Sequence, residues 1–163
     1  MAIERLNIEQ DLVRELFDYR DGALYRKIPS RNTRKTGAVN STGRRQISIN
    51  KKIYKEHRLI FLWHHGWMPF EVDHIDGNPL NNKIENLRAA THSQNVANTL
   101  CRADNTSGEK GVWWDERRSK YVVYTYKDGK RLYGTPAYTE HFDKAVVAAR
   151  ELRVRIHGEF ANQ

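Results

Sequence analysis

The stretch EVDHIDGNPLNNKIENLRAATHSQN, residues 71–95, is rich in Asn, Asp and His and decides how the middle of the chain folds. Residues 70–75 are strand-like, Asp76-Gly77-Asn78-Pro79 is dense in turn formers, and residues 82–87 return as a second arm. Ser93 is a suitable N-cap for a short helix behind this hairpin. We therefore expect the order strand, loop, strand and helix.

Local signals divide the rest of the chain into short helices and strands. Before this stretch we expect a helix from an Asn7 cap to Tyr19, a strand over 23–27, a basic loop, a hairpin of 46–49 and 53–54, and a helix over 57–65. After it we expect three strands over 111–114, 120–126 and 130–134, and then a helix over 139–157. The predicted fold class is α+β, with an N-terminal basic region at 1–56, a hairpin-and-helix module at 57–104 and a sheet-and-helix module at 105–163.

The composition excludes several classes of protein. No apolar run of the 163-residue chain approaches the roughly 20 residues that cross a bilayer, so we do not expect a membrane protein. The N-terminal sequence MAIERLNIEQDLVRELF carries charges where a signal peptide has its apolar core, which predicts a cytoplasmic protein, in the host cytoplasm if a phage encodes it. The single Cys101 excludes an internal disulfide framework and a cysteine-rich zinc site.

Positive charge is concentrated in one part of the chain. The net charge is +8, and residues 26–58 hold eleven basic residues and a single acid, Glu56. Gly, Ser, Thr and Asn are interleaved with them, as in loops that follow a phosphate backbone, although a solvated basic face is the alternative. The predicted DNA contacts of this region are Arg26, Lys27, Arg31, Arg34, Lys35, Arg44, Arg45, Lys51, Lys52 and Arg58.

The Asp73-His74 pair offers the groups that phosphodiester hydrolysis needs. A histidine can take a proton from water, and a carboxylate can hold a divalent ion that offsets charge on the leaving oxygen. Consecutive strand residues point to opposite faces, so a distortion of the hairpin would be needed for both side chains to serve one phosphate. If helix and hairpin pack together, Asp73 and Asn95 present oxygen ligands that suit Mg²⁺ or Mn²⁺.

Two alternatives apply to this stretch. Asp-His and Asn-Asn pairs beside Gly-Asn-Pro are also ordinary turn chemistry. Structural zinc is a further alternative, but the histidines show no finger-like spacing partnered by cysteines.

Residues 57–98, HRLIFLWHHGWMPFEVDHIDGNPLNNKIENLRAATHSQNVAN, closely resemble the HNH endonucleases of phage and intron-homing type in the pattern DHIDGN…NN…NLR…T…QN…N. The resemblance implies a ββα-metal finger in which His74 is the general base and Asp73 and Asn95 hold the divalent ion. It also implies that Asn86 braces the motif.

The resemblance leaves alternative roles open for two further histidines, His92 and His57. Asn95 stands where the family name expects a final histidine, a variant of the homing subgroup, and His92 is its rival for a metal or phosphate role. His57 lies in the HRL element, where it is either structural or a catalytic residue on the leaving-group side.

Residues 105–162, NTSGEKGVWWDERRSKYVVYTYKDGKRLYG…HGEFAN, resemble the Apetala-type DNA-binding domain, although Tyr121 replaces a usual Trp and residues 134–138 depart from the usual run. The resemblance implies a three-stranded sheet in the major groove with a helix behind it. The implied DNA contacts are Trp113, Arg117, Arg118, Lys120, Tyr124 and Arg131. The alternative is that at least one of Trp113, Trp114 and Tyr121 belongs to the core.

Together these patterns predict a monomeric, metal-dependent endonuclease that acts on double-stranded DNA and nicks one strand at a preferred site. One alternative is a catalytically inactive DNA-binding regulator, which would share the basic region and the C-terminal sheet. The other is a nuclease of the same chemistry that acts on other nucleic-acid structures.

Overall fold

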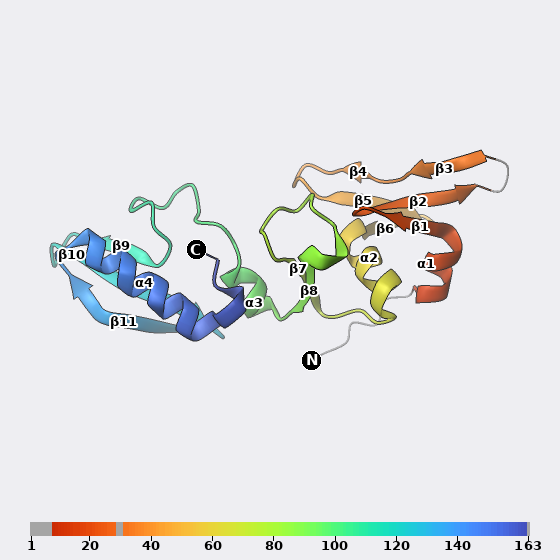
Figure 1. The fold of residues 1–163 in the computed structure, drawn as a ribbon. Helices are drawn as coiled ribbons and strands as arrows, with labels where there is room; N and C mark the ends of the chain where they lie inside the picture. The colour runs from red at the N-terminus through yellow and green to blue at the C-terminus, as the bar shows by residue number, and fades with distance from the viewer. Residues whose placement is uncertain (1–7, 29–30, 163) are drawn as a thin grey trace. The chain divides into compact units, whose positions relative to one another are not determined.

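The computed structural model describes residues 8–28 and 31–162, without the side chains of residues 31–35 (Figure 1). The chain forms two compact units, Met1–His92 and Ser93–Gln163, and each is described by itself. The described residues combine α-helices with small antiparallel sheets, which confirms the predicted α+β class. The finer division into three functional modules stays a prediction.

The first unit begins with a short helix and a meander of three strands. These elements are α1 (Gln10–Leu16), β1 (Phe17–Arg20), β2 (Ala23–Ile28) and β3 (Arg31–Lys35). The helix predicted to reach Tyr19 ends at Leu16, because residues 17–20 are extended and pair with β2 across the left-handed turn at Asp21-Gly22. The predicted Asn7 cap lies outside the described residues.

The basic region also forms a second antiparallel sheet. Its strands are β4 (Ala38–Val39), β5 (Arg45–Ile49) and β6 (Lys52–Lys55), in the order β4-β5-β6. Asn50 and Lys51 both have positive φ, which suits the two-residue turn between β5 and β6. The segment predicted as a basic loop is therefore partly strand, since β3 and β4 both lie within it.

The helix and hairpin at the centre of the motif follow the predicted order, with shifted boundaries. They comprise α2 (Glu56–His65), β7 (Glu71–His74), the 3₁₀ turn η1 (Ile84–Asn86), β8 (Leu87–Ala90) and α3 (His92–Ala97). The predicted helix end at residue 65 is correct, because Gly66, in the left-handed conformation, ends α2. The prediction that the return arm spans 82–87 was wrong. A turn and η1 come first, and the strand that pairs with β7 is β8, which begins at Leu87.

The core of the first unit gathers around α2. Leu59, Ile60, Phe61 and Leu62 on this helix pack with Val13 of α1, Phe17 and Leu24 of the first sheet, Ile47 and Ile49 of the second, and Val72 and Leu87 of the hairpin. Truncating one of these large buried side chains to Ala typically costs about 2–5 kcal/mol. One helix thus ties both sheets and the β7–β8 hairpin together.

The second unit is a three-stranded antiparallel sheet with one long helix on one face (Figure 1). Its elements are β9 (Val112–Asp115), β10 (Lys120–Lys127), β11 (Lys130–Thr139), α4 (Phe142–His157) and the 3₁₀ turn η2 (Gly158–Phe160). Val112 and Val123 of the sheet pack against Ala145, Ala149 and Leu152 of α4.

Two features of the second unit differ from the sequence predictions. The third strand continues to Thr139 instead of ending near residue 134, and α4 starts correspondingly later, because residues 138–139 still pair with β10. Tyr121 packs against the core and contacts Phe142 and Trp114, which confirms the core alternative for this aromatic. No helix in the described part of the chain has the length and apolar character needed to cross a bilayer.

Candidate active site

The β7–β8 hairpin places Asp73 and His74 in two different environments. Asp73 pairs with Arg88 and His74 pairs with Leu87 in an uninterrupted antiparallel register. The ladder therefore lacks the distortion that would let both side chains act on one phosphate. Normal strand alternation directs the two side chains to opposite faces. Each side chain has its own set of partners.

Asp73 is a buried carboxylate held by an arginine from the neighbouring strand. Its side chain is 5% exposed, and its Oδ2 atom accepts a hydrogen bond from Nε of Arg88 at 2.9 Å. A carboxylate offers about four lone-pair sites, so this ion pair is compatible with a further role as a metal ligand.

His74 is buried on the other side of the strand, with 4% of its surface exposed. Its Nε2 atom lies 2.9 Å from Oδ1 of Asn82. Burial lowers the pKa of His74 below its usual value near 6.5, and the charge of Arg44 lowers it further, against the opposing effect of the Asn82 hydrogen bond. The imidazole is therefore neutral at physiological pH, the state in which it can accept a proton.

His57, from the first turn of α2, lies against the His74 ring. The two ring centroids are 4.9 Å apart in an edge-to-face arrangement, and Nδ1 of His57 is buried with no hydrogen-bond partner among the described residues. Burial, followed by the charges of His74 and nearby Arg and Lys side chains, lowers the pKa of His57 to about 2. A neutral, buried His57 supports the structural alternative for this residue over proton donation to the leaving group.

Asn86 ties together the loop between the two strands. Its Oδ1 atom accepts a hydrogen bond from the backbone N–H of Asp76, and its Nδ2 donates to Oδ1 of Asp76 and to the carbonyl of Asn81. Nδ2 of Asn81 donates to the second oxygen of Asp76. These contacts support the bracing role that the resemblance implies for Asn86.

Glu56 is a member of this region that sequence reasoning missed. In the sequence it is only the single acid among the basic residues of 26–58. In the structure it is 0% exposed, and its Oε2 atom accepts a hydrogen bond from Nε of Arg45 at 2.7 Å. The same oxygen accepts a bond from Nδ2 of Asn82, 26 residues further along the chain, at 3.4 Å. No local sequence signal connects residues so far apart.

The two rival residues at the end of the motif lie in α3. Nδ1 of His92 is 2.8 Å from Oε1 of Glu71, so this ring is in contact with an acid of β7. Asn95 belongs to the second unit, because the division between the units falls directly after His92. Among the described residues there is no group of three or more His, Cys, Asp or Glu side chains able to hold a metal. The metal site of Asp73 and Asn95 stays a prediction.

The predicted DNA-contacting residues of the first unit differ in their surroundings. Lys51 and Lys52 are exposed at the β5–β6 turn. Arg45 is bound to Glu56 and to the carbonyls of Thr36 and Gly37, which gives it a role within the fold beside the predicted DNA contact.

The remaining basic residues of this region are held mainly by backbone carbonyls. Arg26 donates to Ser48, Lys27 to Arg14, and Arg58 to Pro69 and Phe70. Arg44 lies close enough to His57 and His74 to lower the pKa of both. The side chains of Arg31, Arg34 and Lys35 lie outside the description.

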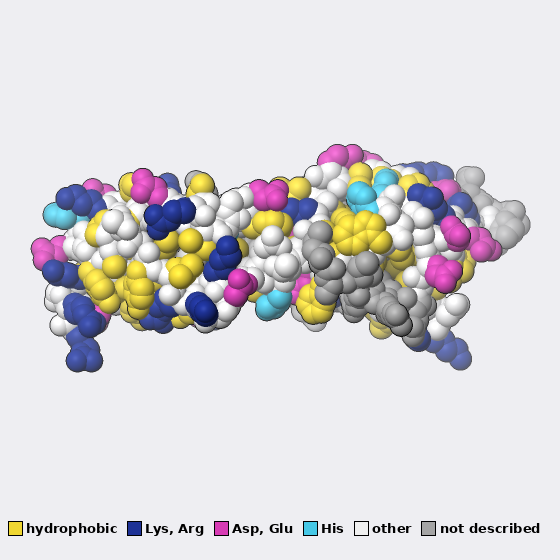
Figure 2. Space-filling model, turned by 90° about the horizontal axis from the view of Figure 1, so that it is seen from below, with side chains coloured by type: hydrophobic (Ala, Val, Ile, Leu, Met, Phe, Trp, Pro, Cys, Tyr) yellow, Lys and Arg dark blue, Asp and Glu magenta, His cyan; other side chains and the backbone are white. Residues whose placement is uncertain are grey.

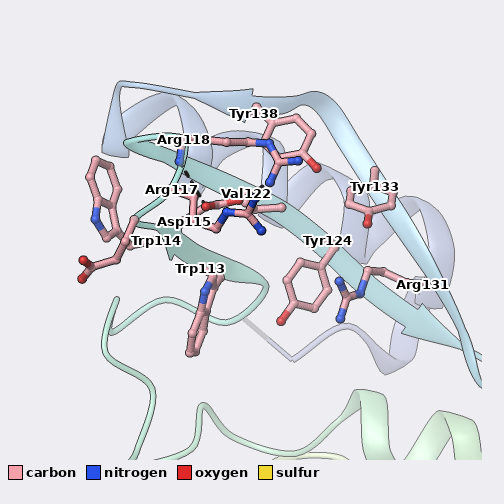
Figure 3. Close-up of a pocket in the computed structure, with 11 residues that line it drawn as sticks. Trp113, Trp114, Asp115, Arg117, Arg118, Val122, Tyr124, Arg131, Tyr133 and Tyr138 are labelled. Atoms are coloured by element: carbon pink, nitrogen blue, oxygen red, sulfur yellow. Dashed lines mark hydrogen bonds and ion pairs between the residues drawn. The ribbon is translucent and has the colours of Figure 1, made fainter.

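The face of the C-terminal sheet opposite α4 carries aromatic and arginine side chains (Figure 3). Trp113 is 49% exposed, and the guanidinium of Arg131 lies 4.5 Å from the ring centroid of Tyr124. Arg118 forms an ion pair with Asp115 at 2.6 Å and also lies over the ring of Tyr138. This face therefore brings arginine and aromatic groups into one pocket.

The other two basic residues predicted in this sheet lie at the connection between β9 and β10. Arg117, in the turn, is exposed and lines the pocket, while Nζ of Lys120 lies 3.4 Å from Oε1 of Glu140. Figure 2 shows Lys and Arg side chains on both units, and on the second unit they are mixed with exposed hydrophobic groups.

Comparisons with known proteins identify the family of the chain. The profile of the HNH endonuclease family matches residues 54–97, which contain α2, the β7–β8 hairpin and α3. Protein 3.8 of Escherichia phage T7 is 34% identical over 116 residues, an alignment that covers 68% of this chain and 93% of that protein. No solved structure matches the chain significantly. The chain therefore belongs to the same family as phage T7 Protein 3.8 and carries an HNH endonuclease domain at residues 54–97.

Proposed function

We propose that the protein is a metal-dependent endonuclease that hydrolyses a phosphodiester bond of double-stranded DNA, nicking one strand at a preferred site. The observation that carries the proposal is the arrangement of Asp73 and His74 within the HNH domain. A neutral imidazole and a buried carboxylate lie on opposite sides of one strand, each held by its own partner. Because the undistorted strand keeps the two groups on opposite faces, we propose that the hairpin rearranges when DNA binds, so that Asp73 contacts the ion and His74 the attacking water at one phosphate.

In this proposal His74 takes the proton from the attacking water. The water oxygen forms the new bond to phosphorus while the bond to the 3′ oxygen breaks. The 3′ oxygen takes a proton from solvent water, which leaves a 5′ phosphate and a 3′ hydroxyl. Asn82 holds the imidazole on its Nε2 side, and Asn86 keeps the adjoining loop in shape.

Asp73 and Asn95 are the residues we propose to hold a divalent ion. A carboxylate and an amide oxygen are hard ligands, and Mg²⁺ commonly binds through few protein ligands and retains waters and substrate phosphate. When bound, the ion stabilises negative charge on the leaving 3′ oxygen. The donor set therefore fits Mg²⁺ or Mn²⁺, with Arg88 holding the Asp73 carboxylate in place.

DNA contacts are proposed for both units. In the first unit, the exposed lysines of the β5–β6 turn and Arg44, near the His57–His74 pair, suit phosphate contacts. In the second unit, Arg117, Arg131 and the exposed Trp113 suit contacts to phosphates or base edges. We propose that the protein binds as a monomer and that one active site cuts one strand for each binding event.

A plasmid-nicking assay tests this function. Supercoiled DNA is incubated with Mg²⁺ or Mn²⁺ and the wild type, His74→Ala, or His141→Ala, a control at an exposed histidine of the second unit. We expect wild type and His141→Ala to produce open circles, with loss of activity on EDTA addition, and His74→Ala to bind DNA without cutting. Binding without cutting by the wild type would favour the inactive regulator. Cutting confined to RNA or branched DNA would favour the nuclease of other structures.

A further inference from the structure

Glu56 is a buried acid at the start of α2 whose carboxylate is held in one orientation. Oε1 accepts a hydrogen bond from the backbone N–H of Leu24 at 3.0 Å, and Oε2 accepts one from Nε of Arg45 at 2.7 Å. The side chain is 0% exposed, so these protein groups replace water around it. Donors from two different sheets therefore fix the carboxylate beside the β7–β8 loop.

The fixed carboxylate determines how the side-chain amide of Asn82 is oriented. Asn82 is 1% exposed and lies between Glu56 and His74. A carboxylate that already accepts bonds from donors offers only acceptor oxygens, so the Asn82 atom that faces Glu56 is the amide nitrogen. The amide oxygen of Asn82 then faces His74.

The amide oxygen in turn determines where His74 carries its proton. Oδ1 of Asn82 can only accept a hydrogen bond, and it lies 2.9 Å from Nε2 of His74. Nε2 must therefore be the protonated nitrogen of the neutral ring. The lone pair that can accept a proton is then on Nδ1.

We infer that Glu56 and Asn82 are positioning residues that hold His74 in the Nε2–H tautomer, so that Nδ1 is the atom that accepts the proton from water. The inference rests on the proposed nuclease function for its catalytic consequence, but the tautomer itself can be measured without any substrate. The edge-to-face contact with His57 supports the same orientation, because it limits rotation of the His74 ring. Residues that orient a functional histidine in this way typically change activity about 10- to 100-fold when they are removed.

The direct test is the tautomer of His74 in the full-length, metal-free protein. In ¹⁵N-labelled protein at about pH 8, where an ordinary histidine is neutral, a long-range ¹H–¹⁵N spectrum distinguishes the protonated from the unprotonated ring nitrogen. The His74 signals are assigned by their absence in His74→Gln. We expect protonated Nε2 in the wild type. Protonated Nδ1 in the wild type would overturn the inference without any need for a variant.

Three variants test the two positioning residues. Asn82→Leu removes the acceptor, and we expect mixed tautomers and kcat for nicking reduced by about 10- to 100-fold with KM little changed. Asn82→Asp keeps an oxygen toward the ring, and we expect it to retain the Nε2–H tautomer. In Glu56→Gln one of the two acceptor oxygens becomes an NH2 donor, which would face either the Leu24 N–H or the Arg45 guanidinium, so we expect the side chain to reorient and a second set of His74 signals to appear.

The outcomes separate this inference from the proposed function. Asn162→Leu, which removes an asparagine amide hydrogen bond in the second unit, is the matched control and should leave both the tautomer and kcat unchanged. A folded Asn82→Leu with wild-type tautomer and kcat would overturn the role of Asn82, and the same result for Glu56→Gln would overturn that of Glu56. A wild type with protonated Nε2 that cuts no nucleic acid would support the tautomer assignment and reject the nuclease function.

Discussion

Asp73 and Arg88 face each other across the β7–β8 ladder, with Nε of Arg88 2.9 Å from Oδ2 of Asp73. Both side chains are largely buried, so the guanidinium compensates a carboxylate that water does not reach. The pair therefore has a structural effect that is separate from any metal bound by Asp73.

Removing Arg88 should destabilise the first unit. In Arg88→Ala the Asp73 carboxylate loses its charged partner while staying buried, and breaking such a pair from one side typically costs about 3 kcal/mol. Urea unfolding measures this change. Lys83→Ala, which breaks the exposed pair with Asp21, is the control and should have a much smaller effect. Equal stability of Arg88→Ala and wild type would show that the ion pair contributes nothing.

A divalent ion should stabilise the folded wild type if Asp73 is a ligand. Binding only to the native state adds about 2.7 kcal/mol when the ion is present at 100 times its Kd. Scanning calorimetry with and without Mn²⁺ should therefore show a rise in Tm that EDTA reverses. Asp73→Ala, which removes both oxygens, should lose this rise, whereas Asp143→Ala, at an exposed position in α4, should keep it. A full rise in Asp73→Ala would exclude Asp73 as the ligand.

Arg131 should contribute to DNA affinity through the exposed face of the C-terminal sheet. It lies over Tyr124 and donates to the hydroxyl of Tyr126, so its guanidinium is held in place at the surface. If it contacts a phosphate, Arg131→Ala should weaken binding to all duplexes and reduce the slope of log K against log salt by about 1. Fluorescence anisotropy at several salt concentrations measures both quantities. Arg102→Ala, an exposed arginine outside this face, should leave the slope as it is.

Glu109 should make the stability of the second unit depend on pH. Burial raises the pKa of this carboxyl, but hydrogen bonds from Arg150 and Arg153 outweigh that effect, so its folded-state pKa lies below the usual 4.5. A depressed carboxyl pKa stabilises the fold above the unfolded-state pKa, and this contribution is lost as pH falls through the lower folded-state value.

Glu109→Gln isolates this effect. Urea unfolding from neutral pH down to about pH 3 should show a stability difference between wild type and Glu109→Gln that shrinks with falling pH. Glu151→Gln, at an exposed position of α4, is the control and should follow the wild type. A difference that is constant with pH would contradict the assignment.

Local sequence signals predicted the helices and strands where no distant segment competes for the same residues. The helix predicted over 57–65 is α2, which ends at His65 before Gly66, and the hairpin predicted from 46–49 and 53–54 is formed by β5 and β6. The prediction of a helix to Tyr19 failed at residues 17–19, because α1 ends at Leu16. Pairing with β2 extends these residues instead, and Phe17 is fully buried there.

The sequence by itself showed the resemblance to HNH endonucleases, because Asp73, His74 and Asn86 all lie within one short stretch of the chain. Only the tertiary structure decided what surrounds them. Glu56 meets Asn82 because α2 packs against the β7–β8 hairpin, and no periodicity or spacing encodes a contact between residues 26 positions apart. Burial then makes that contact important, since a polar group removed from water must be satisfied by protein groups, and the available donors and acceptors determine its orientation.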